Sequence, residues 1–362
     1  MPTISDIDKN FKIINASDTL GLRWYDAGAS RMTVRGLAWF NPRAPRWCRL
    51  PPRAQRTVRA DVWTLAQHLA GARICFKTDS SRIVVRVKRD PDVVMPHMPA
   101  TGSHGMALYE GHGVSMRPRS VVVPDPVQTE YERELFRDQP RRLTEYTLYL
   151  PLYSGLKHLS IGLVPGSVIK PPTPPAVPKP AVFYGTSITQ GGCASLPGSD
   201  HVATIGRRLD LDVINLGFSG NGLGEPEVAE LIAEIDASLY ALCYSENAGS
   251  KRLRLTLPRF IRILRHRHPH TPILLVGALA FWHKAYSKDA AAEYERSNDI
   301  MREECLRQRR AGDSRIQFVH GAAVLPPGID AAFVDGVHPT DHGFQIMADH
   351  LTPVVRESLA TG

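Results

Sequence analysis

Paired cysteines are missing from this sequence. Its five cysteines, Cys48, Cys75, Cys193, Cys243 and Cys305, are odd in number, scattered along the chain and never spaced as CxxC. A disulfide framework and a structural zinc site both need paired or closely spaced cysteines. We therefore expect neither in this protein.

Long apolar runs are missing as well. No stretch approaches the roughly 20 apolar residues that a helix needs to span a bilayer. The first residues, MPTISDIDKNFKII, lack the basic start, apolar stretch and small-residue cleavage site of a signal peptide. These absences predict a soluble, cytoplasmic protein with no membrane partner.

A concentrated block of basic residues is the third absence, although the formal net charge is +8. Residues 1–170 hold 25 Lys+Arg and 15 Asp+Glu, a net of +10, and the rest of the chain has a net of −2. The arginines are interspersed with Pro, Val and Leu, and aromatic residues are not interleaved with them as stacking platforms. We expect a solvated arginine-rich surface and no nucleic-acid partner.

Nucleotide-binding and metal-binding motifs are also absent. The glycine-rich segment 217–224 lacks the GxGxxG spacing and the lysine of a P-loop. The tract His266-Arg-His-Pro-His270 is expected to be a solvated helix end at the amino-end side of the sheet. The sequence therefore predicts no cofactor and no bound metal, and nothing in it indicates an oligomeric state.

Proline is abundant at one place, which predicts a boundary. Six prolines lie within residues 170–180, Lys-Pro-Pro-Thr-Pro-Pro-Ala-Val-Pro-Lys-Pro. Such a segment cannot form a helix or a central strand and favours an extended, semi-rigid spacer. We expect a linker here, with one domain at residues 1–169 and another at residues 181–362.

Strand signals dominate before this linker. The predicted strands include residues 73–79 and 82–88, separated by Ser80-Ser81, and residues 145–150 and 158–164, around Ser154-Gly155. One stretch, about 127–137, has a helical pattern. Many short strands separated by Pro and Gly predict an all-β sandwich.

Strand and helix patterns alternate after the linker. Five short apolar runs are each followed by a helix-compatible stretch; they lie at residues 181–184, 212–216, 239–244, 272–276 and 316–319. This alternation predicts an α/β domain with a five-stranded parallel sheet covered on both faces. Active sites in such folds lie at the carboxyl ends of the strands.

Two segments at this predicted edge could form a nucleophilic site. Ser187 follows the first apolar run directly, and Gly185 permits tight backbone geometry beside it. A serine hydroxyl needs a base, which His338 could supply, and Asp335 could orient the imidazole. A turn serine and a loop histidine are the alternative reading. We expect Asp341 to cap the last helix and assign it no chemistry.

Donors for a developing oxyanion could come from the next two strand ends. The loop Asn215-Leu-Gly-Phe-Ser-Gly-Asn-Gly222 offers backbone N–H groups, and Asn247 offers a side-chain amide. Glycines in turns are common, so neither loop identifies a site by itself.

Together these segments resemble the SGNH/GDSL hydrolase family, over residues 181–362. The resemblance implies that Ser187 is the nucleophile and that Asp335 and His338 complete a triad. It also implies an oxyanion hole formed by Ser187, Gly220 and Asn247. Two departures are Thr186, where the family often has Asp, and Glu-Asn-Ala in the third block in place of Gly-Asn-Asp.

The resemblance also implies a fold and an activity. It implies a flavodoxin-like three-layer fold, without the Gly-x-Ser-x-Gly elbow of the α/β-hydrolases. The first half resembles the β-sandwich or jelly-roll domain of some carbohydrate-type SGNH esterases, where it could shape the substrate pocket. Its tryptophans Trp39, Trp47 and Trp63 could stack on a sugar, although core packing accounts for each of them at least as well.

We therefore expect a serine esterase that acts through an acyl-enzyme. Its substrate is expected to be a small-molecule or carbohydrate ester, with a small O-acyl group such as acetyl on a sugar or polyol. One alternative is an acyltransferase that uses the same Ser-His-Asp site. Another is a catalytically silent protein that binds a carbohydrate or a protein partner.

Overall fold

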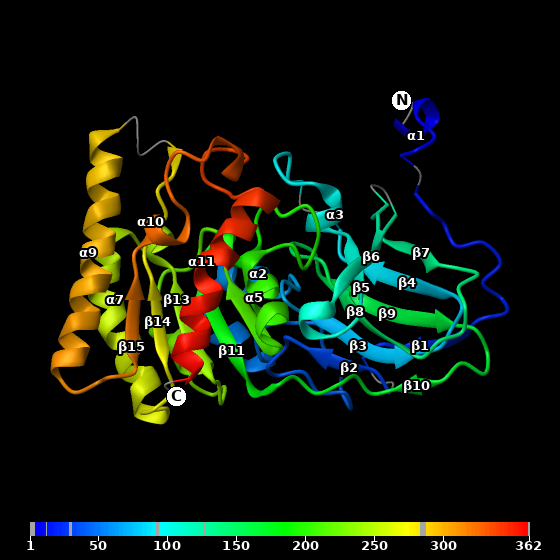
Figure 1. Ribbon diagram of the computed structural model, residues 1–362, viewed down its shortest axis with the longest axis horizontal. Helices are drawn as coiled ribbons and strands as arrows, with labels where there is room; N and C mark the ends of the chain where they lie inside the picture. Colours follow the sequence, from blue (N-terminus) through cyan, green and yellow to red (C-terminus); the bar gives the residue numbers. More distant parts are fainter. Residues whose placement is uncertain are drawn as a thin grey trace.

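The protein consists of an antiparallel β part and a parallel α/β part, which lie side by side along the long axis (Figure 1). This computed structural model describes residues 4–11, 13–28, 31–91, 94–125, 128–282 and 287–360. Among the described helices, none is both long and apolar enough to cross a membrane.

The N-terminal part is a β domain with two antiparallel sheets. Its strands are β1 (Arg23–Asp26), β2 (Thr33–Arg35), β3 (Arg73–Thr78), β4 (Ile83–Arg89), β5 (Met106–Glu110), β6 (Arg117–Val122), β7 (Glu130–Phe136), β8 (Thr144–Tyr149), β9 (Leu156–Leu163) and β10 (Ile169–Lys170). One sheet has the order β1-β9-β4-β7, and the other has β10-β3-β8-β5-β6 with β2 beside β3. Ile74, Phe76, Val85, Leu148 and Ile161 from the two sheets share one fully buried cluster. The predicted all-β sandwich is confirmed.

Consecutive strands of this domain change sheet at the predicted turns. The strands β3 and β4 flank Ser80-Ser81, yet they belong to different sheets. The Ser80 hydroxyl donates to the carbonyl of Arg82 (2.6 Å) and accepts the N–H of Val164 (3.0 Å). These bonds hold the chain where it crosses from one sheet to the other.

The helix predicted at about 127–137 is wrong from residue 130 onward, and residue 127 lies outside the described residues. Residues 130–136 form β7, which pairs antiparallel with β4. Tyr131 and Leu135 are buried, while Glu132 reaches across to Arg86 (2.6 Å). Cross-strand pairing and the burial of Tyr131 and Leu135 therefore override the helical pattern.

The C-terminal part has a sheet of five parallel strands in the order β12-β11-β13-β14-β15. The strands are β11 (Val177–Gly185), β12 (Leu211–Gly217), β13 (Leu239–Cys243), β14 (Ile273–Val276) and β15 (Ile316–Val319). The helices are α4 (Ser187–Gln190), α5 (His201–Leu209), α6 (Pro226–Ile232), α7 (Ser245–Arg267), α9 (Lys288–Arg310), α10 (Gly321–Val324) and α11 (Asp341–Ala360). This is the predicted flavodoxin-like order, in which the second strand lies at the edge beside the first.

Helices cover both faces of this sheet (Figure 1). Val182 and Tyr184 of β11 pack into a buried cluster with side chains of α6, α7 and α9. Their neighbours Ala181 and Phe183 pack into a second cluster with α5 and α11. The side chains of β11 thus alternate between two apolar layers, as a strand buried on both faces requires.

The proline-rich segment differs from the predicted spacer. The central strand β11 begins inside it, at Val177, so the expectation that no central strand would include these prolines is wrong. Val177 pairs with Leu211, but the next paired residue is Ala181, after an irregular register. The two prolines of β11 lie in this irregular stretch, where the ladder does not need their missing N–H groups.

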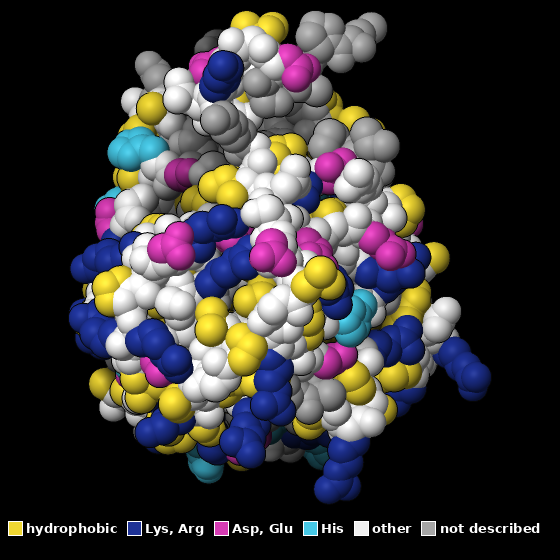
Figure 2. All heavy atoms as spheres, turned by 90° about the vertical axis from the view of Figure 1, so that its right-hand side faces the viewer, with side chains coloured by type: hydrophobic (Ala, Val, Ile, Leu, Met, Phe, Trp, Pro, Cys, Tyr) yellow, Lys and Arg dark blue, Asp and Glu magenta, His cyan; other side chains and the backbone are white. Residues whose placement is uncertain are grey.

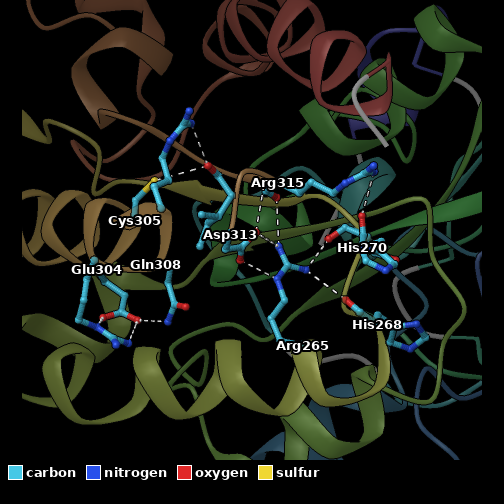
Figure 3. A network of polar contacts seen from close by, with 12 residues as sticks. Arg265, His268, His270, Glu304, Cys305, Gln308, Asp313 and Arg315 are labelled. Atoms are coloured by element: carbon cyan, nitrogen blue, oxygen red, sulfur yellow. Dashed lines mark hydrogen bonds and ion pairs between the residues drawn. The ribbon is translucent and has the colours of Figure 1, made fainter. Parts of the chain in front are cut away.

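A polar network closes the amino-end side of the sheet (Figure 3). Arg265 near the end of α7 donates to Asp313 (Nε–Oδ2 2.7 Å) and to the carbonyl of Arg315 (3.1 Å). The tract 266–270 lies here, away from Ser187, and His268 Nε2 is 2.8 Å from the carbonyl oxygen at the C-cap of α6. The tract therefore lies at a mostly exposed helix end, as expected, with His268 in contact with the end of α6.

Basic side chains of the β domain are dispersed over its surface. On the face in Figure 2 they alternate with acidic and apolar side chains. Lys88 pairs with Glu130 (2.5 Å), next to the Arg86–Glu132 pair. The basic side chains on this face are thus dispersed among other side chains, and Lys88 and Arg86 of the same domain are paired with carboxylates.

Candidate active site

Ser187 lies where β11 passes into the short helix α4. Thr186 is the N-cap of this helix, and its hydroxyl accepts the N–H of Ile188 (3.2 Å). A Cβ at Gly185 would lie 2.5 Å from the carbonyl oxygen of Cys243, so only glycine fits this step of the chain. Thr186 therefore caps the N-terminus of α4, and Ser187 is the first residue of this helix, at the carboxyl edge of the sheet.

Ser187 and His338 are in hydrogen-bond contact although 151 positions separate them. The Ser187 Oγ lies 2.9 Å from His338 Nε2, and His338 Nδ1 lies 2.8 Å from Asp335 Oδ2. The other oxygen of Asp335 accepts the N–H groups of His338 (2.8 Å) and Val337 (3.0 Å). The structure thus brings the three predicted triad residues into one hydrogen-bonded chain.

The charge state of Asp335 fits this arrangement. Partial burial raises the pKa of its carboxyl, but hydrogen bonds from His338 and Val337 outweigh that effect and lower the pKa to about 2. The carboxylate is therefore ionised at neutral pH and favours a proton on His338 Nδ1. The Nε2 lone pair then faces the Ser187 hydroxyl and can accept its proton.

Two of the three predicted oxyanion donors, Ser187 and Asn247, line the same cavity. Asn247 lies in the first turn of α7, and its Oδ1 accepts the N–H of Gly222 (3.2 Å). Because the amide oxygen of Asn247 accepts this bond, its NH₂ group is the end that can donate to another acceptor. Gly220 adopts φ +67, a left-handed conformation that favours glycine, in an exposed position of the neighbouring loop.

The cavity has a volume of about 290 Å³ and a mixed lining. It lies at the carboxyl ends of β11, β13 and β14 and is bounded by α9. Its lining includes Thr186, Ser187, Ile188, Ser245, Glu246, Asn247, Gly249, Ala278, Phe281, Ala290, Glu293, Tyr294, Ser297 and Val337. A small ligand could contact both apolar and hydrogen-bonding groups in it.

Arg49 from the β domain anchors β12, the strand that leads to Gly220. The sequence analysis did not identify Arg49. The side chain is 1% exposed and donates from Nη1 to the carbonyls of Asn215 (3.1 Å) and Gly217 (2.6 Å). Its other nitrogens donate to the carbonyls of His68 and Leu65 (both 2.7 Å). One buried guanidinium therefore ties the β domain to the end of β12.

Gln190 of α4 makes a second link, between the β domain and the loop that follows β12. Its Oε1 accepts the N–H of Ser219 (3.1 Å), and its Nε2 donates to the carbonyl of Leu152 (3.1 Å). The hydroxyl of Tyr153 donates to the carbonyl of Ser187 (3.4 Å). These partners are far apart in the sequence, so no local pattern indicated them.

The three candidate sugar-stacking tryptophans lie elsewhere. Trp39 and Trp63 are half-buried against the cluster that covers one face of the parallel sheet. Trp47 is half-buried against the core of the β sandwich. None of them is among the residues that line the cavity, so the structure favours core packing for all three.

Asp341 does not act as the predicted helix cap. Its Oδ1 accepts the N–H of Ser195 (2.8 Å), and its other oxygen accepts the Ser195 hydroxyl. The hydroxyl of Thr340 accepts the N–H of Gly343 (3.2 Å) instead. The prediction was wrong because the cap position falls one residue earlier, which frees Asp341 to fix the loop after α4.

Comparison with known proteins places both halves of the chain. Residues 178–356 match the GDSL-like Lipase/Acylhydrolase family, and residues 22–169 match the family described as the N-terminus of Esterase_SGNH_hydro-type. Among curated proteins, none matches the chain.

Several solved structures share the whole two-part arrangement. A GDSL-like lipase from Bacteroides ovatus is 29% identical, with a TM-score of 0.86 over 94% of this chain and 98% of its own. The salicylyl-acyltransferase SsfX3 of a tetracycline biosynthetic pathway is 21% identical, with a TM-score of 0.78 over 95% and 100%. An acetyl xylan esterase from the rumen bacterium Butyrivibrio proteoclasticus is 14% identical, with a TM-score of 0.62 over 94% and 100%. The last two likenesses concern the fold alone.

Proposed function

The chain belongs to the SGNH/GDSL hydrolase family and is an esterase, and from this premise we propose that it removes a small O-acyl group from a sugar or polyol. The observation that carries the proposal is the hydrogen-bonded chain of Ser187, His338 and Asp335 at the edge of a cavity with a partly polar lining. One structure of similar fold is that of an acetyl xylan esterase, and this name agrees with the proposed substrate class.

The proposed reaction has two steps. The Ser187 oxygen attacks the ester carbonyl while its proton passes to His338 Nε2, and His338 then protonates the departing alcohol. Water attacks the acyl-enzyme while its proton passes to His338, and His338 then gives this proton to the Ser187 oxygen as the carboxylic acid leaves. The N–H groups of Ser187 and Gly220 and the amide of Asn247 would hold the oxyanion in both steps.

The cavity supports a neutral, hydroxyl-bearing substrate. Glu246 and Glu293 line it, and their carboxylates can accept hydrogen bonds from sugar hydroxyls but would repel an anionic ligand. Partial burial raises the pKa of Glu293, but hydrogen bonds from Ser250 and Arg296 outweigh it and lower the pKa. Glu293 is thus ionised at neutral pH. A cavity of about 290 Å³ also suits a short acyl group better than a long chain.

The β domain supports this proposal as a part of the site. Arg49, Leu152 and Tyr153 contact the segments that hold the nucleophile and the oxyanion loop. We therefore assign residues 1–169 the role of shaping the catalytic domain at residues 181–362, with the segment between them as the connection.

A panel of esters tests the proposal. Acetylated sugars and p-nitrophenyl esters of increasing chain length should be hydrolysed, with the shortest acyl groups fastest. Ser187→Ala should lower the rate by several orders of magnitude, on the order of 10⁶-fold for a nucleophile. Ser297→Ala, a buried serine that lines the same cavity, is the control and should keep nearly the parental rate. Equal rates for the Ser187 variant and the parent would refute the assignment.

Acyl transfer to an alcohol is the second candidate, favoured by the likeness in fold to an acyltransferase over 95% of this chain and 100% of that one. It uses the same acyl-enzyme, but an acceptor alcohol replaces water in the second step. Product analysis with added acceptor alcohols distinguishes the two reactions. Ester products in excess of free acid would identify a transferase.

A further inference from the structure

Four potential metal ligands converge beside the nucleophile. His97, Cys193, Asp335 and His338 each offer one ligand atom, and these atoms all lie within 4.8 Å of one another. They come from three segments: a loop of the β domain, the turn after α4, and the loop before α11. The rings of His97 and His338 are tilted neighbours with centroids 5.6 Å apart.

We propose that these four side chains form a Zn²⁺ site that switches the esterase off. One thiolate, two imidazoles and one carboxylate are ligands that Zn²⁺ accepts, and four of them complete a tetrahedral shell. Mg²⁺ and Ca²⁺ prefer oxygen ligands only, so the same set discriminates against them.

The geometry needs little movement to hold the ion. Ligand atoms about 2.0–2.3 Å from zinc lie roughly 3.5 Å from one another in a tetrahedron. The most distant pair must therefore approach by about 1 Å. The exposed side chain of His97 can supply this movement, while Cys193, only 3% exposed, is held in place.

Zinc at this site would remove the general base, a consequence that rests on the proposed function. If His338 Nε2 binds the ion, the lone pair that should accept the Ser187 proton is occupied. If His338 Nδ1 binds it, the ring must carry its proton on Nε2, and the contact with Asp335 Oδ2 is replaced. Proton transfer from Ser187 stops in either case.

Metal binding can be measured without any catalysis. The Ser187→Ala protein is titrated with Co²⁺ as a spectroscopic substitute for zinc. It should bind one Co²⁺ ion and show a sulfur-to-cobalt charge-transfer band. This band should disappear when Zn²⁺ is added and displaces the cobalt. The band should vanish in the Ser187→Ala protein that also carries Cys193→Ser and persist with Cys305→Ser, another buried free cysteine. Absence of the band, or its persistence with Cys193→Ser, would overturn the site.

Inhibition is measured on the active protein. Zn²⁺ should inhibit hydrolysis of p-nitrophenyl acetate, and a chelator should restore it, while Mg²⁺ has no effect. His97→Gln and Cys193→Ser should each raise the zinc concentration for half-inhibition by about tenfold or more. Equal inhibition of the parent and both variants would overturn the switch. If no ester is hydrolysed at all, the proposed function fails, and the cobalt titration still decides the metal site.

Discussion

Replacing Arg49 tests whether the β domain positions the loop of residues 217–222, which carries the proposed oxyanion donor Gly220. Arg49→Met keeps most of the side-chain volume but removes a buried cation and its donors to four backbone carbonyls, at 2.6–3.1 Å. Burial lowers the pKa of Arg49 to about 10, so the guanidinium is still charged at neutral pH. The variant therefore loses a charged anchor at the end of β12.

The expected magnitude follows from these four contacts. A buried acceptor that loses its donor costs about 1–3 kcal/mol, although carbonyls keep a second lone pair and can relax. Because relaxation recovers part of the sum over four carbonyls, we expect a net loss of about 3–5 kcal/mol in the free energy of unfolding. Gly217 lies three residues before Gly220, and a 1 Å displacement at an active site can cost about 100-fold in rate.

The assay separates positioning from stability. Arg73 is the matched control, because it is also buried, donates to the carbonyls of Gly71 (3.0 Å) and Val213 (3.3 Å), and pairs with Asp212 near the opposite end of β12. Denaturant unfolding should show comparable losses for Arg49→Met and Arg73→Met. Only Arg49→Met should lower kcat by about 100-fold with little change in KM.

Two results would refute this reasoning. The first is an equal fall of kcat in both variants under conditions where both are folded, because the effect would then follow from stability alone. The second is a parental kcat in Arg49→Met.

Three further predictions follow from the site and the core. Asp335→Asn should lower kcat by about 10⁴-fold in ester hydrolysis assays, because an amide NH₂ facing Nδ1 favours the wrong tautomer of His338. Asn247→Ala should lower kcat by about 100–1000-fold with little change in unfolding midpoint. His201 is buried against Phe344, and burial lowers its pKa to about 3. The unfolded chain therefore takes up the proton at higher pH, and stability falls as pH drops from about 6.5 toward 3. His201→Phe should remove about 2 kcal/mol of the loss between pH 7 and pH 5, measured by urea unfolding.

Each of these predictions has a contradicting outcome. Parental turnover in the Asp335 variant would mean that the base needs no orienting carboxylate. An Asn247 variant that changes KM alone would make this amide a substrate ligand. If the variant and the parent show the same pH dependence of unfolding, the His201 imidazole of the parent takes up its proton in the folded state as readily as in the unfolded chain.

The sequence predicted the layered fold well because its signals are local. The five apolar runs of the second half became the five parallel strands, since each run is long enough for one buried strand. The stretch at 130–136 was misread because Glu and Leu have helical propensity, whereas the pairing with β4 that decides its conformation is remote. Propensity loses to tertiary contacts of this kind.

The residues of the candidate site also differ in whether local sequence could identify them. Ser187, Asp335 and His338 could be named because their immediate neighbours form recognisable segments, and the structure brings them together. Arg49 could not be named, because its partner Gly217 is 168 positions away and the contact is to a carbonyl, which every residue carries. Contacts between side chain and backbone over such distances leave no trace in composition or spacing.

The packing of the first half onto the parallel sheet bears on how this enzyme can be divided. Leu50, Ala54 and Val62 lie in the same buried cluster as Leu216 and Tyr240 of the sheet. A fragment that starts at the proline-rich segment would expose this apolar surface to water and favour aggregation. Any attempt to obtain a minimal esterase from residues 181–362 would therefore also need new polar side chains over that face, and the two halves are best expressed and evolved as one piece.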